Sequence, residues 1–64
     1  MADSDKIVLD IKGVIELTTL SQSTIYELAK RGEFPKQVRI GPNRVVWQRA
    51  EVVAWLEQKL AEAA

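Results

Sequence analysis

The sequence of 64 residues contains neither cysteine nor histidine. A chain of this size buries only about 60% of the surface that it exposes when unfolded, and such small domains often rely on disulfide bonds or a structural zinc ion. Disulfides need cysteine, and the common zinc sites need cysteine or histidine. We therefore expect one domain without a cofactor or a metal, held together by apolar packing, for which hydrophobic residues make up 47% of the chain.

The lack of cysteine and histidine, together with the polar residues 1–6, limits the classes of protein to which this chain can belong. Cys–His and Ser–His–Asp mechanisms need a thiol or an imidazole, and so short a chain has little room for a substrate pocket. The polar stretch 1–6 has neither the basic nor the apolar region of a secretory signal, and no apolar run in the sequence approaches the ~20 residues that span a bilayer. We expect a cytoplasmic protein that is not an enzyme, with no small-molecule substrate and no membrane partner.

Charge is distributed unevenly along the chain although the net charge is zero. Residues 22–49 contain six basic and two acidic side chains, whereas the rest of the chain contains three basic and seven acidic ones. A basic centre between acidic ends can focus an electric field on a polyanion such as nucleic acid. The alternative is an ordinary scatter of solvated surface charges.

The first half of the sequence contains two candidate helix N-caps and one glycine that can terminate a helix. Asp10 can cap a helix that ends in a short turn over 18–20, and Ser21 can cap a second helix over 22–31 by accepting a hydrogen bond from a first-turn amide. Gly32 suits the left-handed residue that follows a helix. Two helices joined by so short a turn predict a helix-turn-helix.

A β-hairpin is predicted after the second helix. Short extended runs over 37–40 and 45–47 flank the turn residues 41–44, in which proline fixes φ and asparagine tolerates a positive φ. Alternation along the first run places Val38 and Ile40 on one face of the hairpin, which we expect to be buried, and leaves the other face solvated.

The remaining segments complete the predicted architecture. The apolar stretch 7–9 can form either an edge strand or an extended lead-in, and 49–61 has the apolar stripe of a helix, followed by a frayed end over 62–64. The order of elements predicts a mostly helical α+β fold over 7–61. This fold is a small winged helix-turn-helix: three helices with a two-stranded hairpin, the wing, between the second and the third.

The second predicted helix is the candidate recognition helix. Its outward face is polar, and hydroxyl, amide and cationic side chains can hydrogen-bond base edges or phosphates of double-stranded DNA. The candidate residues on and beside this face are Ser21, Gln22, Ser23, Thr24, Tyr26, Lys30 and Arg31. The alternative is a solvated face on which Glu27 pairs with Lys30 or Arg31.

Cations also gather on the predicted wing. Lys36 stands at its base, Arg39 on its solvated face, and Arg44 at its tip beside Asn43. A basic wing next to a polar helix would contact flanking phosphates or the minor groove. The alternative is that these charges protect an edge hairpin from aggregation.

The aromatic residues argue against binding to RNA or to single strands. Phe34, Trp47 and Trp55 are expected in the core, where a domain without disulfides or zinc needs their large buried areas, and only Tyr26 is expected to be exposed. Binding of single strands and of RNA loops usually needs several exposed aromatic side chains. The alternative function is a protein-interaction module, such as an antirepressor or an oligomerisation subunit, that docks through Val53 and Trp55.

Four segments, in the same order and spacing, resemble the AlpA-like phage regulators, which are similar to phage excisionases and to the DNA-binding head of MerR-type regulators. The segments are 17–26, 32–36, 40–47 and 51–56. The resemblance implies a winged helix-turn-helix that binds DNA in prophages and integrative elements. It also implies a role as a transcriptional regulator, as an excisionase that helps an integrase remove the element, or as both, with recognition through 21–31 and a wing over 39–47.

Three positions depart from the pattern of that family. Thr19 stands where members usually have glycine, which predicts a wider or strained turn, and Gln22 and Glu27 stand where members often carry a basic residue. Fewer positive charges on the recognition helix predict weak binding by one protomer. We therefore expect a homodimer or cooperative assembly along the DNA. As a DNA-binding protein, it is expected to associate with the nucleoid.

Overall fold

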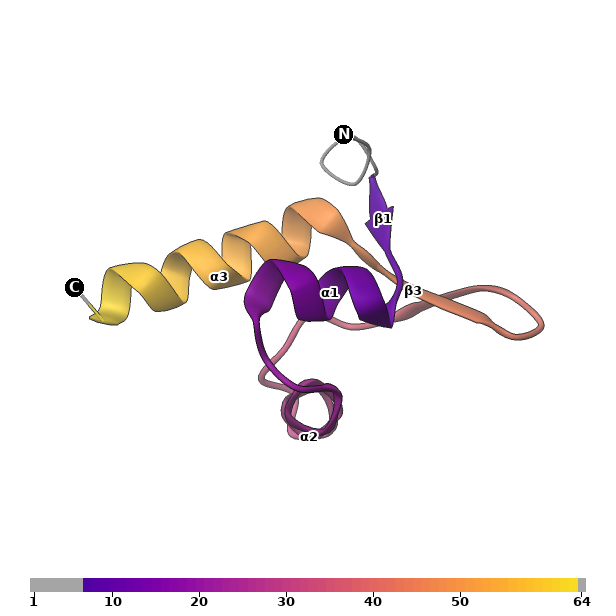
Figure 1. The fold of residues 1–64 in the computed structure, drawn as a ribbon, viewed down its shortest axis with the longest axis horizontal. Helices are drawn as coiled ribbons and strands as arrows, with labels where there is room; N and C mark the ends of the chain where they lie inside the picture. Colours follow the sequence, from indigo (N-terminus) through magenta and orange to yellow (C-terminus); the bar gives the residue numbers. More distant parts are fainter. Residues whose placement is uncertain (1–6, 64) are drawn as a thin grey trace.

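The computed structural model describes residues 7–63 as three helices and a small antiparallel sheet (Figure 1). The elements in chain order are β1 (Val8–Leu9), α1 (Ile11–Thr18), α2 (Gln22–Lys30), β2 (Val38–Gly41), β3 (Arg44–Gln48) and α3 (Arg49–Ala63). This arrangement confirms the predicted mostly helical α+β fold and is that of a small winged helix-turn-helix. The tail predicted over 1–6 lies outside the described residues.

The sheet has the strand order β1–β3–β2, with β3 in the centre. Val8 and Leu9 pair antiparallel with Gln48 and Trp47, so the apolar run before α1 forms an edge strand, one of its two predicted states. Strands β2 and β3 form the predicted hairpin, which projects beyond the helices at the right of Figure 1. We call β2, β3 and the turn between them the wing.

The prediction that Val38 and Ile40 lie on a buried face of the hairpin is wrong for both residues. Val38 and Ile40 in β2 are 39% and 59% exposed, whereas Val46 in β3 is 2% exposed. Helices α1 and α3 pack against β3, the central strand, while β2 is an edge strand of a projecting hairpin. Alternation in the sequence assigns residues to a common face, but burial of that face requires a second layer to cover it.

The predicted helix boundaries rest on local hydrogen bonds. The Asp10 carboxylate accepts from the amide of Gly13 at 2.9 Å, and the Ser21 hydroxyl accepts from the amide of Thr24 at 3.2 Å. Gly32 follows α2 with a φ of 76°, in the left-handed region, and the amides of residues 32 and 33 donate to carbonyls of the last turn in a Schellman arrangement. These three features confirm the predicted caps and the predicted helix stop.

The turn between α1 and α2 contains a strained residue. Thr19 has a φ of 62°, which β-branched side chains rarely adopt. Its amide donates to the carbonyl of Ile15 at 2.7 Å and so closes the last turn of α1. The strained turn predicted from threonine at this position is therefore present.

Apolar side chains from every layer meet in one small core. The buried apolar residues are Leu9, Val14, Ile25, Phe34, Val46, Trp47 and Val52. They come from all three helices, from β1 and β3, and from the loop after α2, so the same core positions the helix-turn-helix and the wing. Phe34 and Trp47 are buried as predicted, and Tyr26 is exposed as predicted.

Helix α3 packs against the rest of the fold through its first half. Trp55 is partly buried, its indole nitrogen donates to the carbonyl oxygen of Glu33 at 2.9 Å, and its ring packs edge-on against Phe34 with 4.7 Å between centroids. The helix extends to Ala63, two residues beyond its predicted end, and residues 57–63 are all exposed. Within residues 7–63, no helix combines the length and the apolar character that crossing a membrane requires.

Candidate nucleic-acid interface

Helix α2 presents its polar side chains to solvent. All seven residues predicted for the recognition helix, from Ser21 to Arg31, are exposed, while Ile25 on the opposite face is fully buried. In Figure 1, α2 is seen end-on whereas α1 runs across the view, so the two helices cross steeply. This is the geometry of a helix-turn-helix, in which the second helix stands free on its outward side.

The polar residues at the start of α2 fall into two groups, according to whether their side chains form hydrogen bonds within the protein. The Ser21 hydroxyl accepts from the Thr24 amide and donates to the Thr24 hydroxyl at 2.9 Å, so both side chains maintain the start of the helix. The exposed side chains of Gln22 and Ser23 have no protein partner among the hydrogen bonds of residues 7–63. Gln22 and Ser23 are therefore the side chains best placed to reach a ligand from this end of α2.

The last turn of α2 carries one ion pair. Arg31 Nη2 lies 3.2 Å from Glu27 Oε2, and the two side chains are 59% and 64% exposed. The solvated pairing weighed as an alternative for this face is thus present for Arg31. Exposed pairs of this kind contribute at most about 1 kcal/mol, so an incoming phosphate could compete for the guanidinium.

Arg39 in the wing is tied to the wing's own turn. Its Nη2 donates to the carbonyl oxygen of Pro42 at 2.8 Å, and its Nε donates to that of Gly41 at 3.4 Å. The guanidinium thereby holds the turn while staying exposed. Asn43 in the same turn and Lys36 at the base of the wing are exposed as well.

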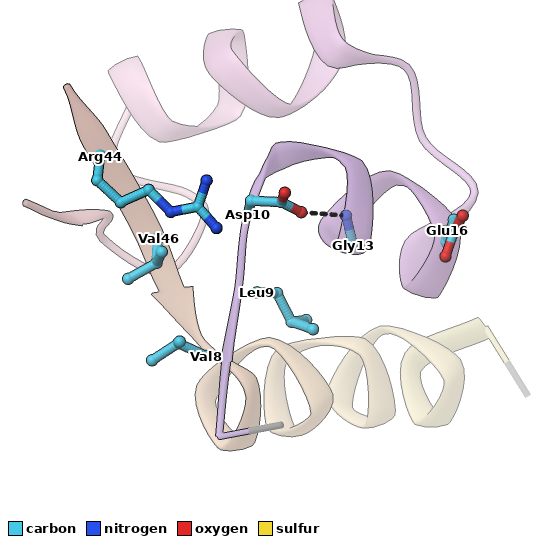
Figure 2. Close-up of a pocket in the computed structure, with 7 residues that line it drawn as sticks. All are labelled: Val8, Leu9, Asp10, Gly13, Glu16, Arg44 and Val46. Carbon is cyan, nitrogen blue, oxygen red and sulfur yellow. Dashed lines mark hydrogen bonds between the residues drawn. The ribbon is translucent and has the colours of Figure 1, made fainter. Parts of the chain in front are cut away.

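Arg44 lies at the tip of the wing, as predicted, and its side chain extends toward the start of α1. It lines a hollow of about 340 Å³ between α1, β1 and β3, and Figure 2 shows its guanidinium extending from β3 toward the start of α1, while the Asp10 carboxylate is directed toward Gly13. Glu16 lines the same hollow, but at the far end of α1, away from Arg44. Arg44 stays exposed at the rim of this hollow.

Two hollows meet at Tyr26, between α2 and the wing. The β2-side hollow is lined by Tyr26 together with Lys30, Lys36 and Gln37. The α1-side hollow is lined by Tyr26 together with Lys12, Asn43 and Arg44. The structure therefore gathers the predicted residues Tyr26, Lys30 and Lys36 at one place, and Asn43 and Arg44 beside them.

Lys12 is a member of this surface that no sequence pattern singled out. It lies in the first turn of α1, outside the basic stretch 22–49, and comes close to the wing turn because β1 pairs with β3 just before α1 begins. That pairing joins segments almost forty residues apart, so no local pattern near Lys12 could have revealed it.

The chemistry that this surface offers is the binding of anions and hydrogen-bonding partners. Cationic and amide side chains are the groups that contact DNA phosphates and base edges. Among residues 7–63, no three or more Asp, Glu, His or Cys side chains come together in a way that could hold a metal ion.

Comparison with known proteins agrees with this architecture. A family model described as prophage CP4-57 regulatory protein (AlpA) matches residues 8–60, which include α1, α2 and the whole wing. A protein of Enterobacteria phage P4, the uncharacterized protein ORF88, is 47% identical over 53 residues, which are 83% of this chain and 60% of that protein. No solved structure gives a significant match. The chain therefore belongs to the AlpA family of prophage regulatory proteins.

Proposed function

We propose that this member of the AlpA family binds double-stranded DNA, with α2 in the major groove and the wing on the flanking phosphates or in the minor groove. The observation that carries the proposal is the continuity between the exposed polar face of α2 and the cations of the wing, which meet at Tyr26. A regulatory family whose members are found in prophages agrees with this role.

Different side chains would serve different parts of the contact. Gln22 and Ser23, exposed at the start of α2, would read base edges, since amide and hydroxyl groups can do so in the major groove. Lys30, Arg31 and the wing cations would bind phosphates, which position the protein without reading sequence.

Binding assays with three nucleic acids test this proposal. The unmodified protein is titrated at moderate salt with duplex DNA, with one of its single strands and with duplex RNA, and duplex DNA is expected to bind most tightly. Replacing Arg39 and Arg44 together by alanine should weaken duplex binding about tenfold or more, because each would lose a charge-assisted hydrogen bond. Lys59→Ala on α3 is the matched control and should bind like the unmodified protein.

The outcomes separate the candidate functions. Equal affinity of the double variant and the unmodified protein, with both folded by circular dichroism, would contradict the role of the wing. Failure of the unmodified protein to bind duplex DNA, together with a stable oligomer in solution, would favour a protein-interaction module. Docking of such a module through Trp55 has less support, because this side chain already packs on Phe34 and bonds to Glu33.

We further propose that the protein regulates a prophage or integrative element, through transcription, through excision together with an integrase, or through both. Mapping its bound sites in the host genome distinguishes these roles, since a site beside the integrase attachment region indicates excision and a site over a promoter indicates control of transcription. One protomer offers a small footprint, so we expect cooperative assembly, tested by comparing affinity for DNA with one and with two copies of the site.

A further inference from the structure

We infer that Lys12 of α1 belongs to the DNA-binding surface, and that Tyr26 separates two seats for neighbouring phosphate groups of one DNA strand. The inference rests on the proposed function and adds a third element, α1, to the contact that α2 and the wing would make. The two seats are the α1-side hollow and the β2-side hollow.

The α1-side hollow draws its donors from three elements. Lys12 comes from the first turn of α1, Tyr26 from α2, and Asn43 and Arg44 from the tip of the wing, around a volume of about 400 Å³. All four side chains are exposed. Ammonium, hydroxyl, amide and guanidinium groups are all donors to phosphate oxygens, so the chemical class of ligand that fits this hollow is a phosphate group.

The charge balance of this hollow depends on Lys12. Asp10 lines it too, and its carboxylate is directed toward Gly13, whose amide donates to it at 2.9 Å (Figure 2). Among the described residues, the lining of this hollow carries two cations, Lys12 and Arg44, and one anion, Asp10. Without Lys12, the lining would carry one cation and one anion.

The β2-side hollow lies on the other flank of Tyr26. Within the described part of the chain, its lining contains two cations, Lys30 and Lys36, the amide of Gln37, and no carboxylate. It is an open depression with a volume of about 440 Å³, comparable to the α1-side hollow. Two cationic hollows on either side of one side chain match an anion that repeats at a regular interval, which is the property of a DNA backbone.

Tyr26 is a rigid boundary between the two hollows. Its ring lies against Trp47, with 6.1 Å between centroids, and Trp47 is fully buried in the core. The exposed part of the ring is therefore held in place, with its hydroxyl available to donate to a phosphate on either side. Tyr26 therefore lies between two groups of cations, Lys12 and Arg44 on one flank and Lys30 and Lys36 on the other.

Three single substitutions test the role of Lys12 through its charge. Lys12→Gln should weaken binding to duplex DNA about fivefold at moderate salt, and should reduce the magnitude of the slope of log Kobs against log salt by about 0.9. Asp10→Asn keeps a good helix cap and removes the one anion among the described residues that line the hollow, so it should tighten binding by a similar factor. Lys59→Gln makes the same charge change on the exposed half of α3 and should leave both the affinity and the slope unchanged.

Uncharged backbone linkages in the DNA identify the phosphate that Lys12 contacts. Methylphosphonates are placed one at a time in a duplex that carries the mapped site, and binding is measured for the unmodified protein and for Lys12→Gln. At the seated phosphate, neutralisation should weaken the unmodified protein and have little further effect on the variant. Additive losses at every position would overturn the assignment of Lys12 to a phosphate.

Failure of this inference is distinguishable from failure of the proposed function. If Lys12→Gln and Lys59→Gln both bind like the unmodified protein while the Arg39 and Arg44 double variant binds weakly, the assignment of Lys12 to the contact is wrong and DNA binding by α2 and the wing stands. If the unmodified protein does not bind duplex DNA, the proposed function is wrong and the inference with it. Unfolding temperatures equal to that of the unmodified protein show that each variant is folded.

Discussion

The ring of Tyr26 on α2 lies against the ring of Trp47 on β3, with 6.1 Å between the centroids and 52° between the planes. Trp47 is fully buried and Tyr26 is 41% exposed, so the core ring supports the surface ring. This contact joins the helix and the strand that carry the two halves of the proposed DNA contact. It thereby sets their relative position before any ligand binds.

Substitutions of Tyr26 should separate packing from hydrogen bonding. Tyr26→Phe keeps the ring on Trp47, so we expect unchanged stability and DNA affinity reduced severalfold by the loss of the hydroxyl. Tyr26→Ala also removes the ring contact and should lower the free energy of unfolding by about 1–2 kcal/mol. Thermal unfolding and fluorescence anisotropy with labelled DNA measure the two effects; equal stability of both variants would show that the ring contact contributes nothing.

The dependence of affinity on salt should report the number of phosphates bound. With about three to five phosphate contacts per protomer, log Kobs should fall with log salt with a slope of roughly −3 to −5. Titrations at four or more salt concentrations provide the slope. A slope near zero would mean that phosphates contribute little to binding, contrary to the role given to the wing and to Lys30.

Thr19→Gly should stabilise the protein. Glycine adopts the observed φ of 62° without the steric penalty that threonine incurs, a gain of up to about 1 kcal/mol after the greater freedom of glycine in the unfolded chain is included. Thr19→Ala is the control, because it removes the same hydroxyl and keeps a Cβ atom, and it should not gain this stability. Urea unfolding compares the two, and equal stability of the two variants would show that backbone strain at this turn is negligible.

The two strands of the wing should differ in their tolerance of polar residues, although Val38 of β2 and Val46 of β3 are cross-strand partners. Val38→Thr and Ile40→Thr change exposed positions, and each should alter the free energy of unfolding by less than about 0.5 kcal/mol. Val46→Thr places a hydroxyl in the core and should cost about 1–3 kcal/mol. Chemical denaturation of the three variants tests this contrast, and a large cost at Val38 or Ile40 would indicate that another surface covers β2 in solution.

The bond between Trp55 and Glu33 should stabilise the junction of α3 with the loop after α2. Trp55→Phe keeps an aromatic ring against Phe34 and removes the indole donor, so the free energy of unfolding should fall by about 1–2 kcal/mol. Amide hydrogen exchange should become faster around Gly32 and Glu33. Unchanged exchange at these amides would show that the bond does not restrain the loop.

The sequence by itself determined the elements of this protein and their order. The carboxylate of Asp10, the hydroxyl of Ser21 and the missing Cβ of Gly32 act on amides or dihedral angles within a few residues, so their effects are readable along the chain. The strain at Thr19 is readable for the same reason, because it arises in a single pair of dihedral angles.

Only the tertiary structure decided which surfaces these elements share. Alternation grouped Val38 with Ile40 but could not show that no layer covers them, since coverage depends on where α1 and α3 pack. Likewise, Arg44 extends toward the start of α1, and Lys12 joins the tip of the wing, because β1 pairs with β3 across most of the chain. Such pairing is selected by the free energy of the whole core, to which each local pattern contributes only a part.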